Sequence, residues 1–434
     1  MVAGSRDGRT SGHGGDDQTE PARHGDSEWR PSRQVAPLEA MDARARIYVA
    51  GGDDERHMTI VAWTAPDEGG REMTALASML VRLSLLAMPL LGLVLARRYL
   101  LGADLARFDQ PRPRSVNAGQ PVSSGQARIQ TMLEEHEYLM RAEDWPALRI
   151  AFGGSMLEFF GDDMQPSADV EFRDVRAGEV PAEWVLAPGV DPDERLLYVH
   201  GGLFMIGNPK THRTITERLS RRLGVAVLAI DYRLLPEHRR TDGIADCRQA
   251  YGWILEHGPA GPGRARELWV GGDSAGGNLS LMLVAWARDE GLRQANGVIG
   301  LSPVTDETFA SPSMRANADS DHCLRPLGQL LRRLPRIVVG VGQWWDYRRS
   351  PADPMLSPLR GDLASLPPTL LLASTAEMLL DDSVRYANKA REAGSPVELR
   401  LWDHAEHIWP FWAPVLDEGE AAFDHIVDFV EAHR

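Results

Sequence analysis

From about Val170 onward, short apolar runs alternate with segments that have the apolar spacing of amphipathic helices. This alternation predicts an α/β fold in which helices cover both faces of a mostly parallel central sheet. We expect helices over Thr211–Leu223, Asp246–His257 and Asn278–Glu290. We expect strands over the following runs: Leu196–Val199, Val225–Ile230, Leu268–Val270, Val298–Leu301, Leu370–Ala373 and Val397–Trp402.

The first 72 residues differ from the rest of the chain. Their opening part is rich in Gly, Ser, Arg, Asp and His and has almost no apolar periodicity, which is typical of disorder. We therefore interpret residues 1–72 as a disordered extension. The alternative is that they are untranslated and that Met73 is the true start.

Residues 73–104 are predicted to form a hydrophobic helix, with the strongest apolar character over 76–101. The charge-free part, Leu83–Ala96, is shorter than the roughly 20 residues that a membrane-spanning helix needs. Arginines bracket it at Arg82 and at Arg97 and Arg98, where they could meet lipid headgroups. Three interpretations stay open: an anchor on a membrane surface, a marginal membrane-spanning helix, and a helix packed on the body of the protein.

Composition narrows the classes of function. The formal net charge of -15 argues against nucleic acid as a partner, and the 43% hydrophobic content suffices for a large core. Only two cysteines occur, Cys247 and Cys323, so no disulfide framework is expected. We expect a cytoplasmic protein, with attachment to the inner face of the membrane and homo-oligomer formation both left open.

A Gly-x-Ser-x-Gly motif, Gly272–Gly276, stands between a predicted strand and a predicted helix. A serine at such a sharp turn has a strained backbone and exposes its hydroxyl at the carboxyl edge of the sheet, above a helix N-terminus. Ser274 is therefore the predicted nucleophile. Such a serine needs a base, an orienting acid and an oxyanion site.

The sequence His200-Gly201-Gly202 follows the predicted strand Leu196–Val199. Its glycines would let backbone N–H groups point at a developing oxyanion, together with the N–H of the residue after the nucleophile. We expect Gly201, Gly202 and Ala275 to form the oxyanion hole, and His200 to shape the loop without taking a proton.

Two histidines compete for the role of base after the last predicted strand. His404 lies almost on the strand, whereas His407 lies in the loop beyond, so we favour His407. A metal bound by both is a weak alternative, because no helix supports the spacing and no third ligand is evident. Trp409 is expected near the base, in the substrate pocket, while Trp344, Trp345 and Trp412 remain unassigned.

The acid should follow the strand Leu370–Ala373. Glu377 is the first carboxylate after it and is our preferred acid, and Asp381 is the runner-up. Asp381 and Asp382 also fit an acidic first turn of a helix. The order Ser274, Glu377, His407 is the order of triad members in α/β-hydrolases.

These motifs resemble those of the hormone-sensitive-lipase-like esterases, bacterial family IV. The likeness covers roughly residues 130–430. It rests on four motifs: His200–Gly202, Asp231-Tyr232-Arg233-Leu234-Leu235-Pro236-Glu237-His238, Gly272–Gly277 and Asp353-Pro354-Met355-Leu356-Ser357-Pro358-Leu359.

The resemblance implies an α/β-hydrolase core over 166–434 and a helical cap. The cap would comprise 105–165 and an insertion around 310–345. Within the first of these segments the pattern of the chain itself predicts short helices over Ala127–Met140 and Trp145–Phe160. The chain departs from the family at Leu203, where the third glycine is expected, and at Arg239–Asp242. The family's Asp-Pro-Leu-x-Asp acid motif is Glu377-Met378-Leu379-Leu380-Asp381 here, which supports Glu377.

The predicted function is hydrolysis of short- to medium-chain acyl esters through an acyl-enzyme, with no cofactor or metal. Three alternatives are weighed against it. An amidase, deacetylase or arylformamidase could use the same triad. A non-catalytic ligand receptor would be expected to have lost His407, and a membrane-tethered scaffold explains none of the motifs.

Overall fold

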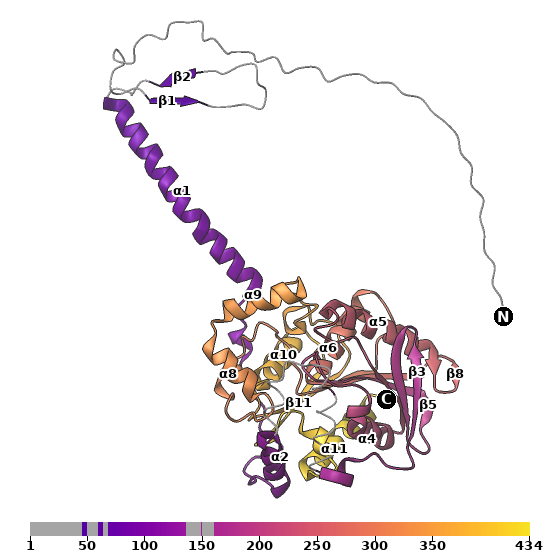
Figure 1. Cartoon of the computed structure of the whole chain (residues 1–434). Coiled ribbons are helices and arrows are strands. Elements are labelled where there is room, and N and C mark those ends of the chain that lie inside the picture. Colours follow the sequence, from indigo (N-terminus) through magenta and orange to yellow (C-terminus); the bar gives the residue numbers. More distant parts are fainter. Residues whose placement is uncertain (1–45, 50–59, 64–67, 136–148, 150–159) are drawn as a thin grey trace, which may run out of the picture. The chain divides into compact units, whose positions relative to one another are not determined.

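The computed structural model describes residues 46–49, 60–63, 68–135, 149 and 160–434 (Figure 1). The chain divides into two compact units, Met1–Leu86 and Ala87–Arg434. In the first, β1 (Arg46–Val49) pairs antiparallel with β2 (Ile60–Trp63). Most of the predicted extension 1–72 and almost all of the predicted helix Trp145–Phe160 lie outside the described residues.

The apolar segment around residue 90 belongs to a single long helix, α1 (Glu68–Leu101). Residues 91–99 of this helix are all exposed, and Leu100 is buried. Within the described ranges, no helix combines the length and the apolar character that crossing a membrane requires.

The second unit contains an eight-stranded sheet in the order β12-β11-β10-β9-β5-β6-β4-β3. The six strands from β12 to β6 are parallel, and β4 and β3 extend the sheet antiparallel at one edge. The strands are β3 (Glu171–Ala177), β4 (Val180–Leu186), β5 (Asp191–Val199), β6 (Val225–Ile230), β9 (Glu267–Asp273), β10 (Gly297–Leu301), β11 (Thr369–Ser374) and β12 (Val397–Trp402). A short hairpin, β7 (His257–Gly258) and β8 (Gly261–Pro262), precedes β9.

All six predicted strands are confirmed, and so is the mostly parallel sheet. The antiparallel strands β3 and β4 are additional. The side chains of β3 are mostly exposed, so the strand carries little of the apolar signal by which a buried strand is recognised.

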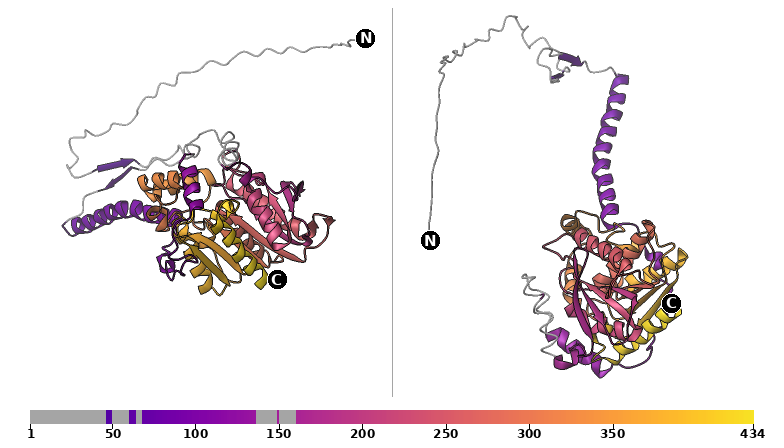
Figure 2. Two further views of the ribbon diagram at one scale, coloured as in Figure 1. Left: turned by 90° about the horizontal axis from the view of Figure 1, so that it is seen from below. Right: turned by 90° about the vertical axis from the view of Figure 1, so that its right-hand side faces the viewer.

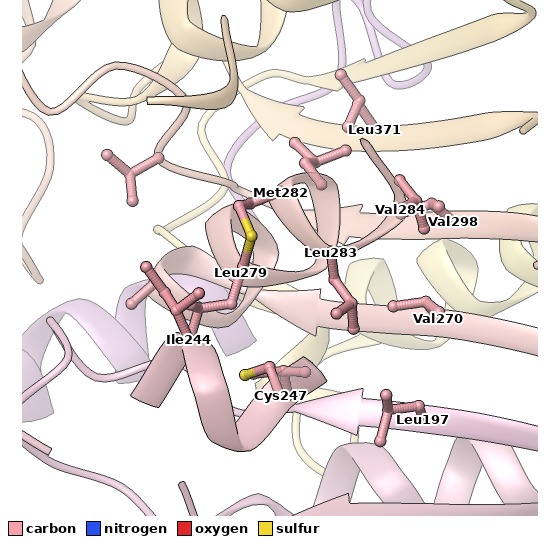
Figure 3. Close-up of a cluster of buried hydrophobic side chains, with 14 of the residues drawn as sticks. Leu197, Ile244, Cys247, Val270, Leu279, Met282, Leu283, Val284, Val298 and Leu371 are labelled. Carbon is pink, nitrogen blue, oxygen red and sulfur yellow. The ribbon is translucent and has the colours of Figure 1, made fainter. Parts of the chain in front are cut away.

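Helices cover both faces of the sheet (Figure 2). Alternate strand residues point to opposite faces, so that Leu197 packs with α5 and α6 while Leu196 packs with α4 and α11. Figure 3 shows the first of these cores, where α6 side chains such as Leu283 lie between α5 and the strand residues Val270 and Val298. The longer helices of the unit are α2 (Ser124–Glu135), α4 (Arg213–Leu223), α5 (Arg240–Glu256), α6 (Ser274–Asp289), α8 (Arg325–Arg333), α9 (Arg336–Tyr347), α10 (Leu380–Glu392) and α11 (Asp417–Ala432).

Shorter helical turns connect these elements. Between β10 and β11 the chain forms α7 (Ser313–Ala316), α8 and α9 before it returns to the sheet. The remaining turns are η2 (Ala106–Phe108), η4 (Gly161–Met164), η5 (Lys210–His212), η6 (Pro358–Arg360) and η7 (Trp409–Trp412).

The parallel register brings four loops to one edge of the sheet. Val199 at the end of β5 is paired with Gly272 of β9, so the glycine loop after β5 lies beside the turn that begins α6. Ser374 at the end of β11 is paired with Trp402 at the end of β12, so the two loops that follow are also neighbours. The carboxyl edge of the sheet is where ligands bind in folds of this kind.

Candidate active site

Ser274 lies at the turn between β9 and α6, with φ at +50°. This conformation is strained for a residue with a side chain, and close packing enforces it. A Cβ atom at Gly276 would lie 1.9 Å from the carbonyl oxygen of Val199, and one at Gly272 would lie 2.5 Å from the same oxygen. The two glycines of the motif therefore allow β5 to pass against the turn.

His407 lies between the serine and a carboxylate. Its Nε2 atom is 3.0 Å from Oγ of Ser274, and its Nδ1 atom is 2.8 Å from Oε2 of Glu377. All three side chains are buried. The structure thus brings together the predicted nucleophile, base and acid, from the loops after β9, β12 and β11.

The environment of His407 favours its protonated form. Burial lowers the pKa of His407, but the hydrogen bond to Glu377 and the negative charges of Glu377, Asp321 and Asp273 raise it, and the net pKa lies above its usual value. An imidazole in this setting can accept a proton from a hydroxyl and hold it as a stabilised imidazolium.

Glu377 is fixed at both of its oxygens. Oε1 accepts the N–H of Ser374 at 3.0 Å, while Oε2 faces the imidazole. The runner-up acid, Asp381, lies elsewhere: its carboxylate pairs with Arg112 at 2.6 Å and accepts the N–H of Ser313 at 2.9 Å. Asp381 therefore lies in the acidic first turn of α10, as the alternative to a catalytic role predicts.

His404 has a different environment from His407. It is exposed, with φ at +63°, just after β12. The two rings do not share a ligand site, because both ring nitrogens of His407 face the serine and the glutamate.

The glycine loop differs from the prediction in one donor. The N–H of Gly201 donates to Oδ1 of Asp273 at 3.0 Å, so it is not available for an oxyanion. The N–H groups of Gly202 and Leu203 donate to no described group. Leu203 and Ala275 line the cavity beside Ser274. The set of candidate oxyanion donors is thus corrected to Gly202, Leu203 and Ala275.

Asp273 has a structural role that the sequence did not reveal. Its buried carboxylate accepts the hydroxyl of Tyr198 at 2.6 Å as well as the N–H of Gly201. Burial raises the pKa of Asp273, but the nearby His212 and the hydrogen bond from Tyr198 lower it by more. The net pKa lies below its usual value, so the group stays ionised. It ties the glycine loop to the nucleophile turn.

His200 shapes the loop from within. Its Nδ1 atom lies 2.8 Å from the carbonyl oxygen of Gly201, and its ring stacks on Tyr232. Burial lowers the pKa of His200 to about 3, so the ring is neutral near neutral pH. None of the described hydrogen bonds joins His200 to Ser274, so this ring does not exchange a proton directly with the serine.

The segment that precedes α8 holds the acid loop in place. Asn317 Nδ2 donates to the carbonyl oxygens of Thr375 and Glu377, at 2.9 and 2.8 Å. Asp321 accepts the N–H of Met378, the residue after Glu377, at 2.8 Å. Burial raises the pKa of Asp321 to about 6. Neither Asn317 nor Asp321 belongs to a motif, so neither contact could be predicted from the sequence.

A cavity of about 770 Å³ opens over Ser274. Most of its wall is apolar, and α8 and α9 contribute a large part of it. The lining residues include Leu203, Phe204, Met205, Ala275, Phe309, Met314, Leu324, Pro326, Leu327, Leu330 and Tyr347. Such a cavity is large enough for a small ligand and supplies an apolar surface for an acyl chain.

The prediction that Trp409 lines this pocket is wrong for the described cavity. Trp409 is fully buried, packs on Trp402 with ring centroids 5.0 Å apart, and donates its indole N–H to the carbonyl oxygen of Glu418. Ile408 adopts a left-handed conformation and turns the chain into the core directly after His407. Proximity in sequence therefore does not place the indole at the site.

The chain is similar to known α/β-hydrolases and esterases. A family described by its alpha/beta hydrolase fold matches residues 196–411. An acetyl-hydrolase of Streptomyces hygroscopicus is 33% identical over 64% of this chain and 86% of its own length, and an esterase of Acinetobacter venetianus is 30% identical over 60% and 82%. A crystal structure of an esterase from the bacterial hormone-sensitive lipase family is 30% identical, with a TM-score of 0.63 over 72% of this chain and 99% of that one.

Proposed function

Because the chain belongs to the bacterial hormone-sensitive lipase family of α/β-hydrolases, whose members include carboxylic ester hydrolases, we propose that it hydrolyses esters through Ser274, His407 and Glu377. The observation that carries this proposal is the continuous contact from Glu377 through the imidazole to Oγ of Ser274, at 2.8 and 3.0 Å. The proposed oxyanion donors are the N–H groups of Gly202, Leu203 and Ala275.

The reaction follows from these positions. His407 Nε2 takes the proton of Ser274 as Oγ attacks the ester carbonyl, and the oxyanion accepts hydrogen bonds from the three backbone donors. Each donor typically contributes about 3 kcal/mol to the transition state. His407 then gives its proton to the departing alcohol, which leaves an acyl group on Ser274.

Water completes the cycle. His407 removes a proton from a water molecule that attacks the acyl-enzyme carbonyl, and returns it to Oγ of Ser274 as the carboxylic acid forms. Glu377 keeps the imidazole in the tautomer with its proton on Nδ1 and stabilises the imidazolium. None of these steps calls on a metal or a cofactor.

The cavity supports acyl esters of short to medium length as substrates. Its wall offers apolar side chains from Phe204, Phe309 and Leu327 and few groups that could bind a charged acyl chain. Arg333 and Asp346 also line the cavity, so that the polar part of a substrate meets charge as well as apolar surface.

A fluorophosphonate probe tests the nucleophile. The protein should gain one label, located on Ser274 by peptide mass spectrometry, and lose ester turnover in step with labelling. Ser274→Ala should abolish both. Ser280→Ala is the matched control, because Ser280 is buried in the same helix and its hydroxyl has no described partner. A label on another residue, or none in folded and active protein, would refute the proposal.

A panel of esters and matching amides separates an esterase from an amidase.

A further inference from the structure

The outward face of α9 carries an apolar stripe. Val338, Val341 and Trp345 are 50%, 49% and 62% exposed, and they repeat at the spacing of one helix face. The other side of the same helix serves the protein itself, since Val339 packs against the core and Tyr347 lines the cavity. A helix whose core-facing side is already occupied gains nothing from exposing large apolar side chains to water.

Further exposed apolar side chains lie on two neighbouring elements. A Cβ atom at Gly340 would lie 3.5 Å from Cβ of Leu100, so the end of α1 adjoins α9. Leu95 and Tyr99 of α1 are 59% and 54% exposed. Leu330 of α8 is 51% exposed and also lines the cavity. We call the exposed apolar side chains of α8, of α9 and of residues 91–99 of α1 the apolar rim.

Positive charge accompanies the apolar rim. Residues 324–349 contain six arginines and one acidic residue, Asp346, in a chain whose net charge is -15. Three of these arginines form ion pairs with acidic side chains outside the segment: Arg325 with Glu134, Arg332 with Asp319 and Arg349 with Asp353. Arg97, Arg98, Arg333 and Arg348 are exposed, and the guanidinium of Arg348 lies over the ring of Trp345 at 4.4 Å. Exposed tryptophan, aliphatic side chains and arginine together are the composition of a surface that lies in a lipid headgroup layer.

We propose that the apolar rim docks on an anionic lipid surface and that esters dissolved in that layer enter the cavity from there. Leu330 of α8 connects the two surfaces, because it is 51% exposed and also lines the cavity. Docking that covers Leu330 would place this edge of the cavity at the lipid, and the net negative charge of the rest of the chain would orient the rim toward it. The substrate route rests on the proposed ester hydrolysis, whereas the docking does not.

A second copy of the chain fits this rim less well. A two-fold dimer joins the same patch of both copies, so it would bring the exposed arginines of both copies into one interface. Anionic headgroups instead complement them. Apolar contact and charge thus favour lipid as the occupant.

Vesicle flotation of the full chain tests the docking. The protein should float with vesicles of phosphatidylglycerol and phosphatidylcholine, float poorly with pure phosphatidylcholine, and detach in part as salt rises from 0.1 to about 0.5 M. The double variant Val341→Gln/Trp345→Gln should lose about tenfold or more in vesicle affinity. The control Val116→Gln/Val122→Gln removes two exposed valines from the linker before α2 and should bind as the parent does.

The second readout is turnover. Both double variants should hydrolyse a water-soluble ester at the parent rate in the absence of vesicles, while only Val341→Gln/Trp345→Gln should slow on an ester carried in anionic vesicles. Equal vesicle binding by parent and variant would overturn the proposal, and so would a dimer in light scattering that this variant converts to a monomer. Vesicle binding without turnover of any ester would refute the proposed function and leave the docking standing.

Discussion

The Nε2 atom of His407 lies 3.0 Å from Oγ of Ser274, although 133 positions separate the two residues in the sequence. The parallel sheet makes this contact, because the loops after β9 and β12 both emerge at its carboxyl edge. Removing this base should therefore lower kcat strongly, whereas removing a nearby histidine should not.

His407→Ala should lower kcat by about 10⁴-fold or more, since the serine then has no group to take its proton. His404→Ala is the matched control, the same change three residues away on an exposed side chain. It should alter kcat by less than about threefold. Steady-state kinetics on a soluble ester with thermal unfolding of each variant would measure this, and a larger loss at His404 would contradict the assignment.

Much of this site could be predicted from sequence because each member follows a recognisable strand. Ser274 stands in a glycine motif, and Glu377 and His407 are carboxylate and imidazole in the loops after two apolar runs. In a parallel sheet the carboxyl ends of all strands lie at the same edge, so the loops that follow them can meet there.

The rest depended on contacts that no local pattern encodes. Gly201 differs from the prediction because the Asp273 side chain, from the neighbouring strand, takes its N–H. Trp409 differs because one left-handed residue, Ile408, turns the chain inward. Asp321 comes from an insertion that shares no motif with the acid loop it holds.

Glu377→Gln should lower kcat by about 10³- to 10⁴-fold, because the amide cannot stabilise the imidazolium and no longer fixes its tautomer. Asp381→Asn should leave kcat within a few-fold. It should instead lower the free energy of unfolding by about 1–3 kcal/mol, because the buried side chain loses its ion pair with Arg112. Kinetics and denaturant unfolding of the two variants separate these effects. If Asp381→Asn instead removed activity in folded protein, the acid would be misassigned.

The pH profile should follow His407. Below its pKa the imidazole is protonated and cannot accept the serine proton, so kcat/KM should fall as pH falls through that pKa. The structure raises the pKa of His407 above the ordinary value of about 6.5, so the acid limb should have its midpoint above pH 6.5.

Removing the acid tests the cause of that shift. In Glu377→Gln the residual activity should have an acid limb at lower pH, because the hydrogen bond and charge that raise the pKa of His407 are lost. Profiles of kcat/KM from pH 5 to 9 on a soluble, non-ionising ester would show it. A profile flat down to pH 5, or a midpoint that stays put in the variant, would argue against His407 as the titrating base.

The glycine loop gives the last prediction. Gly202 has φ at +111°, a conformation that disfavours any side chain, and a Cβ atom there would lie 2.3 Å from the carbonyl oxygen of Ile206. Because both obstacles are backbone constraints, Gly202→Ala must move the loop and with it the N–H groups of Gly202 and Leu203. Loss of one such donor typically lowers kcat by about 10²- to 10³-fold, and we expect a loss of that size with a smaller change in KM.

Gly252→Ala is the control for that substitution. Gly252 is exposed in the middle of α5, and a Cβ atom there meets nothing within 4 Å. The change should keep full activity and stabilise the helix by up to about 1 kcal/mol. Thermal unfolding of both variants would separate a misplaced oxyanion donor from a lost fold, because it does not depend on the active site. Turnover within threefold of the parent in a folded Gly202→Ala protein would mean that the loop does not hold the oxyanion.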